Sequence, residues 1–189
     1  MLQHLSKLVT LAAILPLIVA QCDNPPTGAD PRACCNCPRV LPPRDQFVTC
    51  MQKIPMPSGP PPAPGTPPPG ANCMAECVLE QMGIITGGAL SKDAAQSKVN
   101  SIMGSAPEWV PIAQKVVDSC YAKVSGKLSE KDSNGCSVAA GSFMECLPTD
   151  MFINCPASSW TASGECEAIK TYLNKGCTIM GLMRGPPPF

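Results

Sequence analysis

The sequence contains almost no histidine. Its single histidine, His4, lies in an N-terminal stretch with the features of a secretory signal peptide over residues 1–20: Lys7, then an apolar run, then the small Ala20 as a cleavage point. The chain that remains after cleavage has no imidazole. This excludes Ser-His-Asp and Cys-His catalysis, phospholipase chemistry based on a His–Asp pair, and zinc sites with histidine ligands.

Several other features are absent. No second apolar stretch of about 18 residues follows the signal, so stable membrane insertion is not expected. The 14 basic and 14 acidic residues form no basic patch or charged run, which excludes nucleic acid as a partner. The acidic residues are scattered singly, as on solvated helix faces, rather than in a hydrolase pair (Glu80, Glu108, Asp118, Glu145 and Asp150). We therefore expect no enzyme, no catalytic residue, no metal and no cofactor.

Cysteine, in contrast, is abundant. All 13 cysteines follow the signal, at positions 22, 34, 35, 37, 50, 73, 77, 120, 136, 146, 155, 166 and 177. In a secreted, extracellular chain such a density predicts disulfides rather than metal thiolates. A metal knuckle formed by the closely spaced Cys34, Cys35 and Cys37 is the alternative, and the export signal and missing histidine argue against it. The odd count leaves one thiol free or paired between chains, so a homodimer is compatible with it.

One helix is expected to organise the framework. In the stretch Asn72–Ile85, Cys73 and Cys77 are four residues apart, which places both thiols on one helical face, one turn apart. Each can tie the helix to a different element. We expect Asn72 to cap its start and Gly83 to end it.

Apolar residues recur at helical spacing in five further stretches, and no stretch shows strand-like alternation. Ser91 and Ser163 are expected caps, and Pro148 is expected to interrupt one helix. The sequence thus predicts an all-α bundle of about six helices, the other five lying near residues 44–54, 91–103, 109–125, 136–147 and 165–175.

Composition divides the chain further. Residues 21–49 form a Cys/Pro-rich N-terminal arm, 50–177 a helical domain, and 178–189 a C-terminal tail. Within the domain, nine of the sixteen residues over 55–70 are proline, which favours an extended, semi-rigid surface loop. A ligand for a proline-recognising domain is the alternative, but most such partners are intracellular.

The cysteine spacing resembles a known family. Cys50, Cys73-x3-Cys77, Cys120 and Cys146-x8-Cys155 are similar to the six-cysteine pattern of insect odorant-binding proteins. Cys136, Pro156 and Cys166 further resemble the plus-C branch. The resemblance covers about residues 44–177. The Pro-rich loop departs from it, because the family usually has helix between the first two cysteines.

The resemblance implies a disulfide-bridged helical bundle around an apolar cavity. The pairing it implies is Cys50–Cys77, Cys73–Cys146 and Cys120–Cys155, with Cys136–Cys166 as an extra bridge; the other five cysteines remain unassigned. It also implies a secreted carrier that moves small hydrophobic molecules, such as odorants or pheromones, through aqueous lymph to a chemosensory receptor.

Ten apolar residues are candidates for lining such a cavity, although ordinary core packing explains the periodicity of each equally well. Methionines would suit a pocket of loose specificity, because their side chains are flexible and polarisable. The candidates are Met74, Val78, Met82, Ile85, Trp109, Val116, Phe143, Met144, Met151 and Phe152.

Two other functions fit the composition. A disulfide-linked component of an extracellular matrix or egg covering would use the odd cysteine and the proline-rich segment. A helical defence protein is the weaker option, because the chain lacks the strong positive charge of membrane-active defence proteins.

The absence of histidine leads to a prediction for the carrier. Release triggered by mild acid would have to use carboxylates, so we expect ligand affinity to change little between about pH 7.5 and about pH 6. Titration of a fluorescent ligand at both pH values measures this, and a steep loss of affinity at the lower pH would contradict it.

Overall fold

The computed structural model describes residues 22, 24–28, 30–39, 42–54 and 69–182. The expected signal peptide, most of the Pro-rich loop and the end of the C-terminal tail lie outside these residues. Seven α-helices occur in the described part: α2 (Pro31–Cys34), α3 (Arg44–Lys53), α4 (Ala71–Gln81), α5 (Lys92–Met103), α6 (Val110–Val124), α7 (Val138–Ile153) and α8 (Gly164–Asn174). None of these helices has the length and apolar character needed to cross a membrane.

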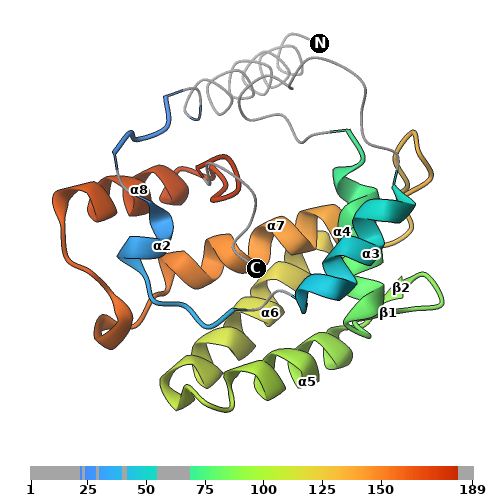
Figure 1. Cartoon of the computed structure of the whole chain (residues 1–189), viewed down its shortest axis with the longest axis horizontal. Coiled ribbons are helices and arrows are strands. Elements are labelled where there is room, and N and C mark those ends of the chain that lie inside the picture. The colour runs from blue at the N-terminus through green and yellow to red at the C-terminus, as the bar shows by residue number, and fades with distance from the viewer. Residues whose placement is uncertain (1–21, 23, 29, 40–41, 55–68, 183–189) are drawn as a thin grey trace, which may run out of the picture.

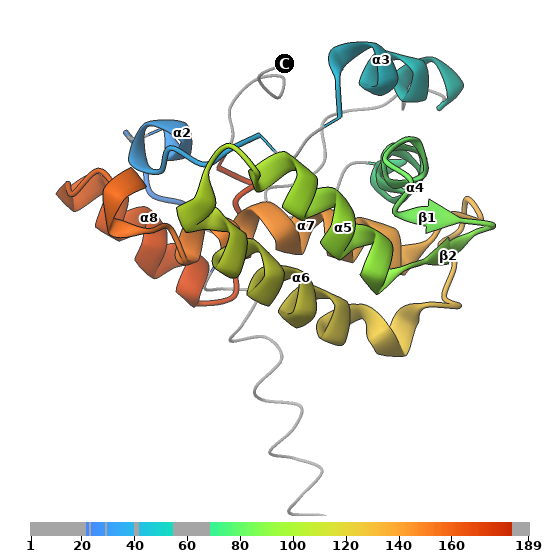
Figure 2. The same cartoon turned by 90° about the horizontal axis from the view of Figure 1, so that it is seen from below.

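Helix α7 crosses the centre of the molecule (Figure 1). It packs against α4 and α6, and α5 packs along α6 as the other half of a helical pair. Helices α8 and α2 lie at one end of α7, whereas α4 and α3 lie at the other, with α3 outermost (Figure 2). This arrangement buries one continuous apolar cluster between the helices. The expected all-α, disulfide-bridged bundle is confirmed.

Helix α4 is shorter than the sequence indicated. Gly70, in the left-handed conformation at φ 81°, precedes its first residue, and the side chain of Asn72 hydrogen-bonds Asp132 instead of capping the helix. The expected cap is therefore wrong. Gly83, at φ 73°, follows the helix end as expected, because glycine adopts this conformation without a steric penalty.

A small hairpin that the sequence analysis missed follows α4. Strands β1 (Ile85–Thr86) and β2 (Ala89–Leu90) pair antiparallel, with Ile85 opposite Leu90. The turn between them is Gly87-Gly88, with φ of 60° and 78°. A Gly-Gly pair at positive φ is a signal for a two-residue hairpin, so the information was present. Ile85 therefore lies on a strand rather than on the helix.

Helix α2, in the N-terminal arm, was not predicted, whereas the remaining helices follow the predicted ones closely. Ser91 and Ser163 each accept a hydrogen bond from a first-turn backbone N–H, as expected of caps. The exception is α7, which continues through Pro148 to Ile153. Pro148 removes one backbone donor, but tertiary packing of α7 against α4 and α6 outweighs that loss.

Six disulfides join the described elements. Cys50–Cys77 ties α3 to α4, Cys73–Cys136 ties α4 to the loop before α7, and Cys120–Cys146 ties α6 to α7. The remaining three join the N-terminal arm to the C-terminal part of the chain: Cys22–Cys177, Cys34–Cys166 and Cys35–Cys155. The last three close loops of 155, 132 and 120 residues. In the chain-entropy model such long loops give about 4–5 kcal/mol per bridge.

Three pairings implied by the family resemblance are wrong: Cys73–Cys146, Cys120–Cys155 and Cys136–Cys166. The interlocked order is nevertheless retained, because Cys50, Cys73, Cys77, Cys120, Cys136 and Cys146 pair first with third, second with fifth and fourth with sixth. In the implied pairing, Cys146 and Cys155 took the fifth and sixth places, which Cys136 and Cys146 occupy in the structure.

The position of α7 explains this difference. Cys136 lies just before its first residue, beside the first turn of α4, whereas Cys146 lies within α7 at the interface with α6. Cys155 lies beyond the end of α7, where it meets the N-terminal arm. The spacing Cys146-x8-Cys155 matches the family pattern in sequence but has a different structural role.

The contact between α4 and α7 generates a prediction. A Cβ atom added at Gly141 would lie 1.9 Å from Asn72 Oδ1. Gly141→Ala should therefore force Asn72 to rotate away from Asp132, at a cost of about 1–3 kcal/mol in the free energy of unfolding. Urea denaturation measures the cost.

Gly126→Ala is the matched control, because a Cβ there meets no atom within 4 Å. In an Asn72→Ala background, which lacks the clashing amide, Gly141→Ala should cost much less. Equal costs in the two backgrounds would show that the Asn72 contact does not limit residue 141.

Candidate ligand-binding site

The ten cavity candidates lie together in the interior. They come from α4 and the residue after it (Met82), β1, the 3-10 turn Pro107–Trp109, α6 and α7, and all belong to one apolar cluster or pack against it. Eight are buried, whereas Met74 and Met144 are partly exposed. Trp109 is 1% exposed and Phe143 fully enclosed. The structure thus places all ten in or against the same hydrophobic core, and their contact with a ligand stays a prediction.

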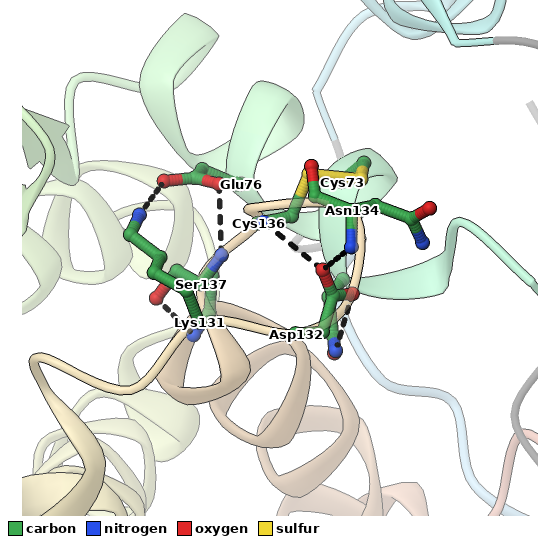
Figure 3. Close-up of polar contacts among 9 residues, drawn as sticks. Cys73, Glu76, Lys131, Asp132, Asn134, Cys136 and Ser137 are labelled. Atoms are coloured by element: carbon green, nitrogen blue, oxygen red, sulfur yellow. Dashed lines mark hydrogen bonds and ion pairs between the residues drawn. A yellow bond between two sulfur atoms is a disulfide. The ribbon is translucent and has the colours of Figure 1, made fainter.

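A group of polar contacts, called the latch below, joins α4 to the loop before α7 (Figure 3). Glu76 on α4 accepts a hydrogen bond from the Ser137 backbone N–H at 2.9 Å and pairs with Lys131 Nζ at 2.8 Å. The Asp132 carboxylate accepts hydrogen bonds from the backbone N–H groups of Asn134 and Cys136. The loop before α7 is thereby held against α4 by charge as well as by Cys73–Cys136.

The Cys136 backbone hydrogen bond, together with those from Asn72 and Asn134, holds the pKa of the Asp132 carboxyl below its usual value. Asp132 therefore remains ionised at neutral pH and keeps its role as a hydrogen-bond acceptor. Glu76 is more than 50 residues from its partners Lys131 and Ser137, so local sequence patterns did not predict the latch. Asp-x-Asn-Gly, a turn-forming stretch, was the available signal.

Two groups of sulfur and carboxylate atoms come within 4.8 Å of one another: Cys73, Asp132 and Cys136, and Cys120, Cys146 and Asp150. In both groups the two cysteines are bonded to each other. Neither group has a thiolate available as a metal ligand.

Cys37 is the cysteine that forms no disulfide within the chain, so it is the odd residue of the thirteen. It is partly buried and packs against the apolar cluster. Burial raises the pKa of the Cys37 thiol to about 12. At neutral pH the thiol is therefore protonated and a poor nucleophile.

A surface groove of about 370 Å³ lies along the outer face of α7. Its floor is the α7 stripe at helical spacing: Ser142, Glu145, Cys146, Thr149, Asp150 and Ile153. The end of α8 and the turn after it form one wall, and Lys123 of α6 lies on the other side. None of the ten interior candidates lines this groove. Of these six floor residues, only Glu145, Cys146 and Asp150 were named individually from the sequence, and none of them as a binding residue.

Comparison with known proteins identifies the family. The sequence model of the AgamOBP47-like family matches residues 65–172, more than half of the chain. The chain belongs to the insect odorant-binding protein family. The match includes the latch and the helices that enclose the interior, and the six disulfides are consistent with the plus-C branch.

Three relatives from Anopheles gambiae are similar to this family member. "Odorant-binding protein 47" is 26% identical over 166 residues, which cover 80% of this chain and 71% of the relative. "General odorant-binding protein 68" is 26% identical over 186 residues, covering 90% and 84%. "General odorant-binding protein 67" is 23% identical over 115 residues, which span 59% of this chain and only 56% of that protein.

The environment of Cys37 generates a prediction about the native protein. A thiol reagent should modify one cysteine per chain in denaturant, and should react much more slowly with the folded protein, because the thiol is partly buried and protonated. Mass spectrometry after timed alkylation measures both. Rapid modification without denaturant, or more than one modified cysteine, would contradict the described pairing.

Proposed function

We infer that the protein is a secreted carrier of small hydrophobic molecules, such as odorants, pheromones or similar semiochemicals. Such a carrier would move its ligand through aqueous lymph to a chemosensory receptor. The membership of the family supports this proposal, as do the printed names of the three relatives. The proposal assigns no catalysis to the chain.

The covalent framework supports an extracellular role. Twelve of the thirteen cysteines form intrachain disulfides, which persist in an oxidising compartment. The same pairing weakens the alternative of a cross-linked structural protein, since Cys37 is left as the one candidate for a bond between chains and is partly buried.

Membership of the family carries the proposal, and the apolar cluster between the cross-linked helices is the region in which we place the ligand. An apolar ligand of roughly 15 heavy atoms, at about 0.5 kcal/mol per atom, would gain about 8 kcal/mol on burial there, which corresponds to micromolar affinity. Met74 and Met144 are the two partly exposed members of the predicted lining. They mark where a ligand would enter.

Displacement of a fluorescent apolar probe from the oxidised protein tests the proposal. We expect saturable one-site binding, displaced by some neutral volatile compounds at micromolar concentration, with a change in Trp109 emission because that indole lies in the interior. Absence of saturable binding by a helical sample with one free thiol would contradict the carrier function.

Two methionine substitutions test whether the fluorescent probe binds at the predicted lining residues. Met144→Ala should weaken probe binding about threefold or more by removing apolar contact area. Met180→Ala is the matched control, because Met180 is 49% exposed and is not among the predicted lining residues. Equal effects of the two substitutions would place the probe elsewhere.

A further inference from the structure

We propose that the groove on the outer face of α7 binds a small amphipathic ammonium compound, at a site separate from the apolar interior. The groove volume of about 370 Å³ lies within the size range of small-molecule sites. Since none of the interior candidates lines the groove, this site does not depend on the carrier function.

Several polar groups in the groove have no partner in the protein. Among the described residues, no hydrogen bond or ion pair reaches the side chains of Ser142, Glu145, Asn174 or Thr178. A few convergent, unpaired polar groups beside apolar surface are characteristic of ligand sites. Here the apolar residues of the lining are Ile153 and Leu173, together with the bonded cysteines Cys146 and Cys177.

The charge of the groove selects the ligand. Asp150 pairs with Lys123 at 2.8 Å and also accepts a hydrogen bond from Ser119, so these two charges neutralise each other. Glu145 has no such ion pair among the described residues, which leaves the groove with one surplus negative charge. An ammonium group is favoured in such a site and a carboxylate is disfavoured.

The end of α8 adds to this preference. Asn174 is the last residue of α8 and lines the groove, so the negative end of the helix dipole lies at its wall. Two contacts hold this wall in place. The Ile179 backbone N–H donates a hydrogen bond to Thr149 Oγ1 at 3.2 Å, and Cys177 forms a disulfide with Cys22. The binding geometry is therefore largely formed without ligand, which reduces the entropic cost of binding.

Three ligands that differ only in the head group test the proposal: 4-phenylbutylamine, 4-phenylbutan-1-ol and 4-phenylbutanoate. Isothermal titration calorimetry on the oxidised protein should show the amine binding about fivefold more tightly than the alcohol, and the carboxylate most weakly. This factor is the one expected for opposite charges about 4 Å apart in a largely hydrated site. Equal affinities for the three, or no binding of the amine, would overturn the proposal.

Glu145→Gln removes the surplus charge and keeps the side-chain size. It should remove most of the amine's advantage over the alcohol, leaving only the smaller contribution of the α8 terminus, and keep the affinity for the alcohol within about twofold. Glu80→Gln, at an exposed carboxylate on α4, is the control for net charge and should change none of the three affinities. A preference for the amine that is undiminished in Glu145→Gln would also overturn the proposal.

A second variant tests the same charge without altering Glu145. Ser142→Lys places an ammonium group one helical turn from Glu145, where it can pair with that carboxylate. It should abolish the preference for the amine in a chain that retains its helical spectrum and single free thiol. The amine should not displace the neutral apolar probe from the interior, so failure of this site and failure of the carrier function are separately visible.

Discussion

Covalent cross-links between distant parts of the chain hold this fold together. Three interlocked disulfides join α3 to α4, α4 to the loop before α7, and α6 to α7. Three more fasten the N-terminal arm to the C-terminal region and close loops of 120 residues or more. Each restricts the unfolded chain, so helices that would be marginal alone are held at fixed positions.

Helix α7 contributes side chains to both regions in which we propose ligand binding. Phe143 and Met151 on one face belong to the apolar cluster, whereas Ser142 and Glu145 on another line the surface groove. The helix is therefore apolar on most sides and polar along one narrow stripe. The disulfide between Cys120 and Cys146 lies at the border of these faces and fixes the rotation of α7 relative to α6.

Much of the secondary structure was predictable because its signals are local. Ser91 and Ser163 precede apolar residues at helical spacing, and both cap helices in the structure. The local signals failed at Pro148, where packing on both sides maintains a helix despite the lost backbone donor. They were also misinterpreted at Ile85, because an apolar residue at helical spacing belongs equally well to a short strand after a glycine.

The sequence by itself determined the helical class, the positions of most helices and the disulfide-rich character of the chain. These follow from composition and from periodicities of a few residues. Tertiary structure alone decided which cysteines pair, since a disulfide needs two Cα atoms within about 4.4–6.8 Å regardless of their spacing in sequence. Cys136 thus meets Cys73 rather than Cys166. The groove has the same origin: Lys123, Glu145 and Asn174 lie on three helices, and only the packing of those helices brings their side chains to one surface.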